Sequence, residues 1–329
     1  MDGSKQDLLQ VQNLTVGYAS SDGNILHAVD DISLVIRSGE TLGVLGESGC
    51  GKSSLARAIL RILPPHANCS GSIRLGDKNI LLLNEQELQM IRGRQTSMVS
   101  QDPALSLNPV LSVGRQIEEV LRAHLPLSGR QRRERVITLL RDVGFDQPLE
   151  IRSVYPHQLS GGQRQRVAIA QALACQPDLL IADEPTSKLD ATSSEEIITL
   201  LSGIRQKHNT SILFISHDPT LFAGFADRLL VMYAGRIVES GAAAAVFGHP
   251  LHPYTRALVR IARSSTLSAS ALRVRLESID GLPPDPAQFK SGCRFEPRCS
   301  DRKEICSQRY PGAFLPEPSH PVNCFNYGE

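Results

Sequence analysis

The segment that decides the fold is residues 40–53, ETLGVLGESGCGKS. Its apolar start predicts a short buried strand, and the sequence after it predicts a helix that ends before Pro64-Pro65. The turn between them has the form G-x-x-x-x-G-K-S, in which glycines let backbone N–H groups turn toward phosphate groups. Lys52 is expected to reach the β- and γ-phosphates of a nucleotide, and Ser53 to offer its hydroxyl to Mg²⁺. The predicted phosphate loop comprises Gly46, Glu47, Ser48, Gly49, Cys50, Gly51, Lys52, Ser53 and Ser54.

An acidic pair further along the chain supplies the second part of such a site. The apolar run LLIADE, residues 179–184, predicts a buried strand that ends on Asp183 and Glu184. Asp183 is placed to reach the metal ion, and Glu184 is placed to polarise an attacking water molecule. A run of this kind in isolation is often only a buried strand with a solvated end, but the phosphate loop favours a shared nucleotide site.

Strand-like and helix-like segments alternate around these two motifs. LLQVQNLTVGY and HAVDDISLVI predict strands near the N-terminus, SILFIS predicts a buried strand, and residues 113–142 have a helical pattern. Alternation of this kind predicts an α/β fold with a mainly parallel sheet covered by helices. After Val246 proline becomes frequent, and SSTLSASA, residues 264–271, predicts a linker into a Cys/Pro-rich tail.

A third motif, LSGGQ, lies between the first two and consists of Leu159, Ser160, Gly161, Gly162 and Gln163. Its small residues and free N–H groups predict a second helix start that can bind phosphate. LSGGQ at this distance from the phosphate loop and the acidic strand resembles the signature of ABC ATPases. The resemblance implies that fold: a parallel-core sheet with an N-terminal antiparallel β subdomain and a helical subdomain at about residues 102–165.

The resemblance also implies roles for other residues. Tyr18 matches the aromatic residue that stacks on adenine, although a tyrosine at a strand edge is the plain alternative. Gln101 matches the glutamine that touches metal and water, so Ser53, Gln101 and Asp183 are the expected Mg²⁺ ligands. His217 matches the histidine that contacts the γ-phosphate, which makes Glu184, Gln101 and His217 the expected catalytic residues.

The resemblance further implies that the working unit is a dimer. In ABC ATPases each ATP is closed by the LSGGQ motif of a second subunit, and Asp190 matches the loop that crosses to that subunit. This chain contains one LSGGQ motif, so it is expected to pair with another ATPase. The higher affinity of ATP for the closed dimer can then drive a coupled conformational change.

Composition narrows the function classes. The net charge of +1 gives no overall field toward nucleic acid, and Glu134 interrupts the basic cluster at residues 130–135, so we expect no nucleic-acid partner. A non-transport ABC ATPase is the rival class, but the chain has one cassette and no sustained heptads. No apolar run is long enough to span a membrane, and the N-terminus does not resemble a signal peptide. We therefore expect a peripheral protein on the cytoplasmic face of the inner membrane.

The C-terminal tail indicates which group of ABC ATPases the chain resembles. HPYTRAL at residues 252–258, GLPPDP and GCRFEPRCSDRKEIC resemble the C-terminal extension of the peptide/nickel importer ATPases. The resemblance implies two domains, residues 1–248 and 249–329, and partners comprising two permease subunits and an external solute-binding protein. It implies import of di- or oligopeptides, with a nickel or other metal chelate as the alternative. Lys188 departs from the family pattern, in which this position is usually small, and favours a paralogous ATPase partner over a second copy.

Four of the seven cysteines, Cys293, Cys299, Cys306 and Cys324, lie in the tail. Their spacing, C-x5-C-x6-C-x17-C, lacks the tight pairs of structural zinc sites, whereas iron–sulfur ligation accepts varied spacings. Some peptide-importer ATPases hold a [4Fe–4S] cluster in this extension, so the resemblance implies one here. Zinc, free thiols or a disulfide remain the alternatives. Arg294, Arg298 and Arg302 are expected to offset the negative charge of the cluster.

Overall fold

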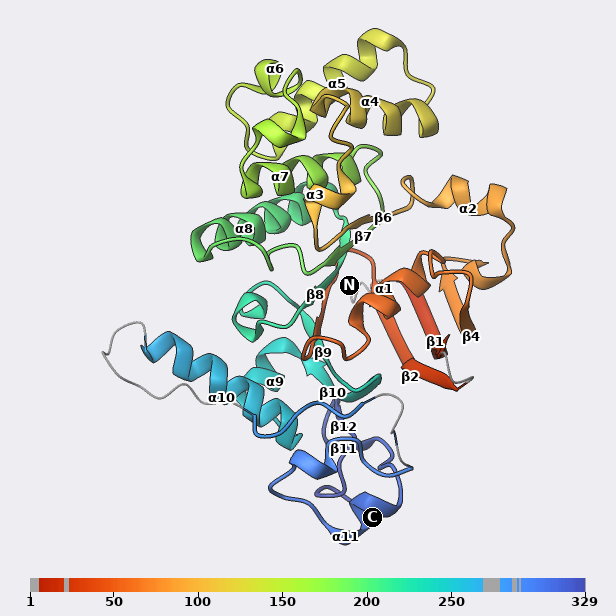
Figure 1. Cartoon of the computed structure of the whole chain (residues 1–329), viewed down its shortest axis with the longest axis vertical. Helices are drawn as coiled ribbons and strands as arrows, with labels where there is room; N and C mark the ends of the chain where they lie inside the picture. The colour runs from red at the N-terminus through yellow and green to blue at the C-terminus, as the bar shows by residue number, and fades with distance from the viewer. Residues whose placement is uncertain (1–5, 21–23, 269–278, 286–288, 290, 329) are drawn as a thin grey trace, which may run out of the picture. The chain divides into compact units, whose positions relative to one another are not determined.

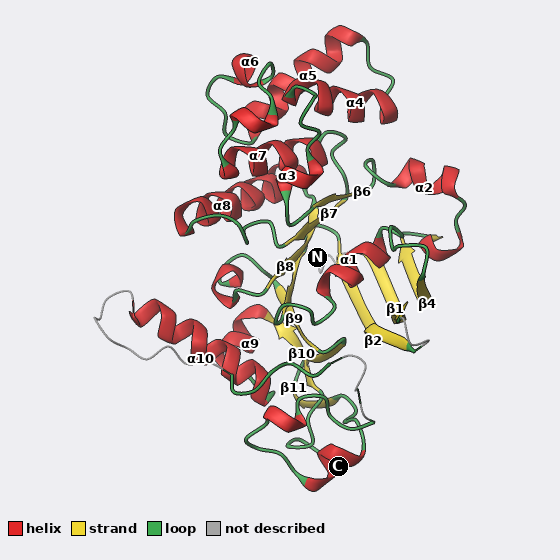
Figure 2. Ribbon diagram, in the orientation of Figure 1, coloured by secondary structure: helices red, strands yellow, loops and turns green. Residues whose placement is uncertain are grey.

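The computed structural model describes residues 6–20, 24–268, 279–285, 289 and 291–328. The chain divides into two compact units. The first unit consists of Met1–Gln10, Val35–Glu40 and Arg74–Ile215, and the second consists of Val11–Leu34, Thr41–Ile73 and Ser216–Glu329. Figures 1 and 2 show their helices and strands.

The N-terminal strands form a four-stranded sheet with the order β2-β1-β4-β5. The strands are β1 (Asp7–Ala19), β2 (Ile25–Arg37), β4 (Ala67–Leu75) and β5 (Lys78–Asn79). Gly71 in β4 has a φ of +105°, and a Cβ added there would lie 2.5 Å from the carbonyl oxygen of Asn13 in β1. Only glycine combines that backbone conformation with so close an approach. The predicted N-terminal β subdomain is confirmed.

The first unit contains three parallel strands that are almost entirely buried. They are β6 (Thr96–Val99), β7 (Leu179–Asp183) and β8 (Ser211–Ser216), and β7 pairs with both neighbours. All residues of β7 and β8 are buried, as their unbroken apolar sequences predict for parallel strands covered on both faces. The order of these strands brings the carboxyl end of β7 beside the carboxyl end of β8.

Helices make up most of the rest of the first unit, and α4, α5, α6 and α7 gather in one group (Figure 1). Side chains cap the starts of α5 and α7. At α5, Ser128 and Gln131 cap each other's backbone, which satisfies N–H groups that have no partner within the helix. The helices are α2 (Glu85–Ile91), α3 (Pro103–Ser106), α4 (Val113–His124), α5 (Gly129–Asp142), α6 (Pro148–Ile151), α7 (Gly161–Ala172) and α8 (Ala191–His208), with the 3₁₀ turns η1 (Ile80–Leu82) and η2 (Pro156–Gln158).

The second unit contains five strands in the order β11-β12-β10-β9-β3. They are β3 (Thr41–Leu45), β9 (Arg228–Tyr233), β10 (Arg236–Ala242), β11 (Phe314–Glu317) and β12 (His320–Val322). β3 and β9 are parallel, whereas β9–β10, β10–β12 and β12–β11 are antiparallel. The tail thus adds two strands to the edge of this sheet, although its sequence gave no strand signal.

The helices of the second unit include a correction to the expected linker. They are α1 (Lys52–Ile59), α9 (Ala243–Gly248), α10 (Pro253–Ser268) and α11 (Glu304–Gln308), with the turns η3 (Pro219–Phe222) and η5 (Glu296–Arg298). The predicted linker at residues 264–271 begins inside α10, because the modest helix propensity of serine and threonine does not stop a helix that has already formed. Its last three residues lie outside the described part of the chain.

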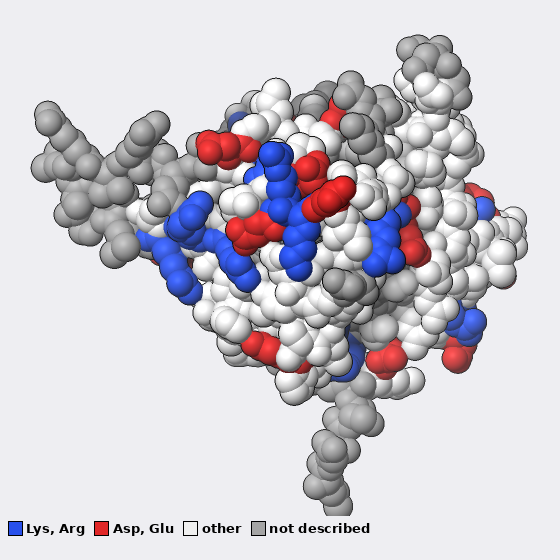
Figure 3. Space-filling view, turned by 90° about the horizontal axis from the view of Figure 1, so that it is seen from below, with Lys and Arg blue, Asp and Glu red and all other residues white. Residues whose placement is uncertain are grey.

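Surface chemistry is mixed on the face drawn in Figure 3, where Lys and Arg side chains are interspersed with Asp and Glu side chains. This mixture accords with the net charge of +1. Among the described residues, no helix has both the length and the apolar character that crossing a bilayer requires.

Candidate nucleotide site

The phosphate loop lies in the second unit, between β3 and α1, as predicted. Two of its glycines are required by the fold. Gly51 has a φ of +106°, and a Cβ there would lie 1.9 Å from the carbonyl oxygen of Ala28, while a Cβ on Gly46 would lie 2.3 Å from that of Met232. The loop is therefore held against β2 and β9 by contacts that admit no side chain at these two positions.

Lys52 is buried beneath the loop that it is expected to serve. Its Nζ donates hydrogen bonds to the carbonyl oxygens of Gly46 (2.7 Å) and Glu47 (2.9 Å). The neighbouring Cys50 is also buried, and burial raises the pKa of its thiol, so it stays protonated as a small packing residue. These contacts place a cation at the start of α1, where the helix N-terminus also favours an anion.

Two further predicted residues lie in this unit. The Tyr18 hydroxyl is 3.0 Å from the Ser54 hydroxyl on α1, and its half-buried ring is 6.3 Å from that of His66. His217 directly follows β8 and is exposed. The structure thus brings Tyr18 to the helix that carries the phosphate loop, while the roles of Tyr18 and His217 stay predictions.

The acidic pair lies in the first unit, at the end of β7, and both residues are buried. Glu184 adopts a φ of +48°, which costs a non-glycine residue roughly 1–3 kcal/mol and is typical of functional sites. Its N–H donates to the carbonyl oxygen of Ile215 (2.9 Å), which holds the unusual backbone in place. The side-chain amide of Gln101 donates to the Glu184 carboxylate at 3.2 Å. The structure therefore joins two of the three predicted catalytic residues.

The LSGGQ motif begins α7, also in the first unit. Ser160 is the N-cap, its hydroxyl accepts from the N–H of Gln163 (3.3 Å), and the Gln163 side chain accepts from the N–H of Ser160 (3.0 Å). Added Cβ atoms on Gly161 and Gly162 would meet neighbours no closer than 3.7 and 3.6 Å, which is ordinary contact. Packing among the described residues therefore does not require these glycines, whereas an approaching phosphate would.

Three motif segments of the first unit line one cavity of about 280 Å³. Gln101 and Asp102, Gly161 of the signature, and Lys188 with Leu189 all line it. Lys188 forms an ion pair with Asp102, and this hydrogen bond lowers the pKa of the Asp102 carboxyl. The sequence marked Lys188 only as a departure and missed its partner, because nothing in the spacing of the two residues signals contact.

Asp190 is exposed and caps α8 by accepting hydrogen bonds from the N–H (2.9 Å) and hydroxyl (2.8 Å) of Ser193. These bonds lower the pKa of its carboxyl. Gln101, Asp183, Glu184, the signature and Asp190 are thus in the first unit, and the phosphate loop, Tyr18 and His217 are in the second.

The C-terminal extension contacts the phosphate loop at Glu47, which the sequence did not predict. Arg298 forms a bidentate ion pair with the Glu47 carboxylate, with N–O distances of 2.7 and 3.0 Å. The Tyr254 hydroxyl accepts a hydrogen bond from the Glu47 N–H at 2.8 Å. Tyr254 lies in the segment HPYTRAL, and Arg298 lies in CRFEPRC. Both segments resemble the extension of a known family, but that resemblance does not predict these two contacts.

The four tail cysteines lie close enough to influence one another, and no disulfide joins them in the described structure. The Cys293 N–H donates to the carbonyl oxygen of Cys306 (2.7 Å). Burial raises the pKa of Cys293 to about 11, and the thiols of Cys306, Cys324 and Cys299 add to this effect. Among the described residues, no group of three or more His, Cys, Asp or Glu side chains is arranged to hold a metal ion.

The arginines between the cysteines have partners other than the expected cluster. Arg298 pairs with Glu47, Arg294 pairs with Asp30 in β2, and Arg302 lies 3.9 Å from Glu296. Carboxylates thus offset the charge of the two buried arginines, because a buried guanidinium needs a fixed anionic partner.

Known proteins resemble the chain over most of its length. A model of the ABC transporter family matches residues 29–187, and a model of the oligopeptide/dipeptide transporter C-terminal region matches residues 238–306. The chain is 41% identical to the dipeptide transport ATP-binding protein DppD of Bacillus subtilis, over 97% of this chain and 95% of that protein. It is 43% identical to the oligopeptide transport ATP-binding protein OppD of Salmonella typhimurium, over 94% of this chain and 91% of that protein.

Solved structures confirm the predicted fold. A dimeric structure of the ATP-binding cassette MJ0796 in a post-hydrolysis state, bound to ADP and Pi, has a TM-score of 0.64 at 29% identity and covers 71% of this chain and 98% of its own. CbiO1 of Clostridium perfringens has a TM-score of 0.63 at 30% identity and covers 80% of this chain and 100% of its own. The chain belongs to the ABC transporter family, among the ATP-binding subunits that carry the oligopeptide/dipeptide transporter C-terminal region.

Proposed function

We propose that this chain is the ATP-hydrolysing subunit of an importer of di- and oligopeptides. The observation that carries the proposal is the similarity to DppD and OppD over more than nine tenths of the chain, extension included. The same machinery importing nickel or another metal chelate is the second candidate, because the sequence of the extension also resembles that of nickel importers. Residues 1–248 are proposed as the ATPase domain and residues 249–329 as the extension.

The proposed chemistry follows from the residues of the two units. ATP binds with Mg²⁺, whose expected oxygen ligands are Ser53, Gln101 and Asp183, a donor set of the kind that this ion prefers. Lys52 holds the β- and γ-phosphates, Tyr18 stacks on adenine, and His217 contacts the γ-phosphate. Glu184 orients the attacking water and accepts its proton, and the amide of Gln101 holds the Glu184 carboxylate in place.

The second half of each site is proposed to come from a partner ATPase. The exposed start of α7, with Ser160, Gly161 and Gly162, has glycines that the described structure does not need for its own packing. A γ-phosphate held by the partner subunit would fit such a helix N-terminus. We favour a paralogous partner over a second copy, since Lys188 departs from the family pattern. Counting the distinct ATPase chains in the purified membrane complex tests this, and two copies of this chain alone would refute it.

Two permeases and an external binding protein are the remaining proposed partners, with this subunit on the cytoplasmic face of the inner membrane. Exposed apolar side chains support a permease contact in the first unit: Leu105 and Val110, shortly after Gln101, are 86% and 75% exposed. Apolar side chains at such exposure are accessible to an apolar surface of a partner protein. The segment that senses nucleotide and the proposed permease contact are thus adjacent in the chain.

The experiment is uptake by the complete complex in proteoliposomes. We expect ATP-dependent accumulation of labelled di- or oligopeptides, and Lys52→Ala should abolish it by weakening nucleotide binding. Accumulation of a nickel chelate without peptide uptake would favour the second candidate. Peptide uptake that continues without ATP would contradict the proposal.

A [4Fe–4S] cluster on Cys293, Cys299, Cys306 and Cys324 is proposed as a structural or regulatory group. The backbone hydrogen bond between Cys293 and Cys306 and the cavity that both residues line support it. The described arrangement of the four cysteines is not a ligand set, so the segment would have to close around the cluster. Anaerobically purified complex should contain about four iron and four sulfide per chain. Cys→Ser changes at these positions should remove the iron, while Cys69→Ser should not. Colourless protein with one zinc, or a disulfide between two of the four, would exclude the cluster.

A further inference from the structure

The phosphate loop has an anchor outside the motifs that define the nucleotide site. Two residues of the extension bind Glu47, the second residue of the loop. Arg298 binds its carboxylate, and the Tyr254 hydroxyl accepts a hydrogen bond from its backbone N–H. All three residues belong to the second unit. Arg298 is 251 residues away from Glu47 in the chain, so the contact exists only because the extension folds back onto the loop.

The Arg298 guanidinium group uses all of its hydrogen-bond donors in this position. Its guanidinium group donates five hydrogen bonds, to the two Glu47 carboxylate oxygens, the Tyr233 hydroxyl and the carbonyl oxygens of Ile279 and Asp280. An arginine has five N–H donors, so every one is satisfied. The side chain is only 4% exposed, and the bidentate geometry is the strongest form of such a pair. Arg298 therefore holds the Glu47 carboxylate in one orientation.

The Glu47 carboxylate matters because of where the loop binds phosphate. A carboxylate beside the phosphates of ATP repels them unless a cation balances its charge. Arg298 supplies that cation through its bidentate pair with Glu47. A loop already fixed in one conformation also loses less entropy when the ligand binds. Loss of Arg298 would both free the loop and leave its negative charge unbalanced.

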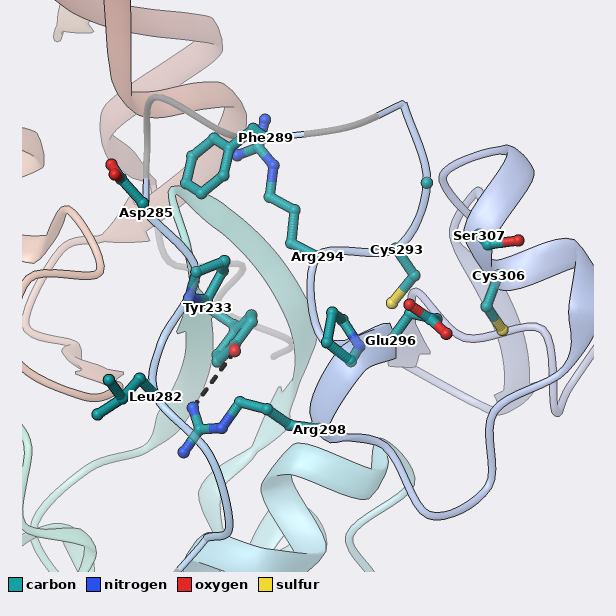
Figure 4. A pocket seen from close by; sticks show the side chains of 13 residues that line it. Tyr233, Leu282, Asp285, Phe289, Cys293, Arg294, Glu296, Arg298, Cys306 and Ser307 are labelled. Carbon is teal, nitrogen blue, oxygen red and sulfur yellow. Dashed lines mark hydrogen bonds between the residues drawn. The ribbon is translucent and has the colours of Figure 1, made fainter.

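The turn that carries Arg298 is part of the cysteine segment. In η5 the Glu296 N–H donates to the carbonyl oxygen of Cys293 (3.0 Å), and the Cys299 N–H donates to that of Glu296 (3.1 Å). Arg298, Tyr233, Cys293 and Cys306 line one cavity of about 360 Å³, where the Arg298 guanidinium reaches the Tyr233 hydroxyl (Figure 4). The position of Arg298 therefore follows the conformation of the turn between Cys293 and Cys299.

An aromatic cluster fixes the same turn to α10 and β9. Phe295, between Cys293 and Arg298, has its ring centroid 5.2 Å from that of Tyr233 and 5.5 Å from that of Tyr254. Tyr233 and Tyr254 are 4.7 Å apart. Aromatic pairs at these separations attract one another beyond the effect of burial alone. The extension thus presents Arg298 and Tyr254 to the loop from a packed support.

We propose that Arg298 is a positioning residue for ATP binding, which acts through Glu47 and makes the C-terminal extension part of the nucleotide-binding machinery. This deepens the proposed function, on which it depends for its readout of ATP hydrolysis. The substrate contacts remain those of the phosphate loop, and Arg298 sets the charge and orientation of that loop.

The test measures the ATP KM and kcat of the complete complex. Arg298→Ala should raise KM about 10-fold or more, the effect of losing hydrogen bonds to a charged group, while kcat at saturating ATP stays within about twofold. Arg298→Lys should recover only part of the affinity, because lysine cannot form the bidentate pair. Arg302→Ala is the matched control: Arg302 lies in the same segment but is 62% exposed, and its change should leave KM unaltered.

A double-mutant cycle distinguishes action through Glu47 from general loosening. In the Glu47→Gln background, Arg298→Ala should raise KM by less than about threefold, because the charge that it balanced is already gone. An undiminished effect in that background, a loss of kcat without a change in KM, or an equal effect of Arg302→Ala would overturn the proposal. If Arg298→Ala does not fold, Arg298→Lys decides, and an unchanged KM overturns the proposal. A wild-type complex without ATPase activity would instead contradict the proposed function.

Discussion

Two ion pairs tie loops of the nucleotide machinery to other segments, and they differ in almost every respect. Arg298 and Glu47 in the second unit are 4% and 24% exposed and form a bidentate pair. Lys188 and Asp102 in the first unit are 58% and 24% exposed and meet through a single ammonium group. The first pair joins the phosphate loop to the extension, whereas the second joins two loops that are already part of the ATPase motifs.

The difference indicates a division of labour between the two units. In the first unit the motif contacts join residues 83 and 86 positions apart in the chain: Gln101 binds Glu184, and Lys188 binds Asp102. In the second unit, Tyr254 and Arg298 bind Glu47 of the phosphate loop from more than 200 positions away in the chain. We therefore expect changes in the first unit to alter turnover and changes at the support of the loop to alter nucleotide affinity.

The largest effect is expected from Glu184→Gln, which tests whether a change in the first unit alters turnover. The amide keeps the size of the side chain but cannot accept a proton from water, and loss of a general base typically costs about 10²–10⁴-fold in kcat. ATP affinity should be retained, because the phosphate loop is in the other unit. Steady-state hydrolysis and equilibrium ATP binding by the complex check both halves. Hydrolysis at the wild-type rate would remove Glu184 from its proposed role.

A smaller effect is expected from Tyr254→Phe, which tests whether a contact between the extension and the phosphate loop alters nucleotide affinity. The change removes the acceptor of the Glu47 N–H, and an unsatisfied buried donor costs about 1–3 kcal/mol, so the ATP KM should rise about fivefold or more with kcat retained. Tyr327→Phe is the control, since it also removes one hydroxyl near the start of α10, where Tyr327 donates to the carbonyl oxygen of Leu251 (3.0 Å). Equal KM changes in the two variants would show that the Tyr254 hydroxyl has no special link to the loop.

The third prediction concerns pH and the support of Tyr254. His252 is buried and accepts from the Tyr254 N–H (3.0 Å), and burial, with the nearby Arg256 charge, lowers its pKa to about 3. The unfolded chain binds a proton at this histidine below about pH 6.5, whereas the folded chain does not, so stability falls as pH drops from 6.5 toward 3. Each pH unit in this range costs about 1.4 kcal/mol.

His252→Asn keeps an acceptor for the Tyr254 N–H but cannot take up a proton. We expect the melting temperature of this variant to fall less than that of the wild type between pH 6.5 and 5. His157→Asn is the control, because His157 is an exposed residue of η2 and its replacement should leave the pH dependence of the wild type. Identical curves for His252→Asn and the wild type would contradict a buried neutral His252.

The smallest effect is expected from Lys188→Ala. An exposed pair gains little in water and is screened by salt, so kcat and KM should change by less than about twofold. A large loss of turnover would mean that the exposed pair holds the loop after Gln101 as firmly as Arg298 holds Glu47. Measurement of kcat at low and high salt separates the two cases, because only an electrostatic contribution falls with salt.

Local sequence patterns predicted much of the fold and most of the motif positions. The unbroken apolar runs at β7 and β8 and the glycine-rich turn before α1 are local signals, because a buried parallel strand and a tight turn each need particular residues in sequence. The link between Gln101 and Glu184 was implied by the family pattern, and their hydrogen bond accords with it.

Long-range contacts could not be predicted in this way. Arg298 was assigned to an iron–sulfur cluster, since its position among cysteines was the only visible signal, and its actual partner is 251 residues away. The expected linker after Arg263 was wrong in its first part, because helix α10 continues through Ser264 to Ser268 although serine is a weak helix former. Propensity alone is a weak guide to the residue at which a helix ends.

One measurement tests the division of labour most directly: equilibrium ATP binding and steady-state turnover of Glu184→Gln and Arg298→Ala, each in the complete complex and beside the wild type. We expect Glu184→Gln to bind ATP with an affinity close to that of the wild type but to hydrolyse it at least about 100-fold more slowly. We expect Arg298→Ala to bind ATP about 10-fold or more weakly but to reach nearly the wild-type rate at saturation. An Arg298→Ala variant that kept its affinity and lost its turnover would contradict this division between the two units.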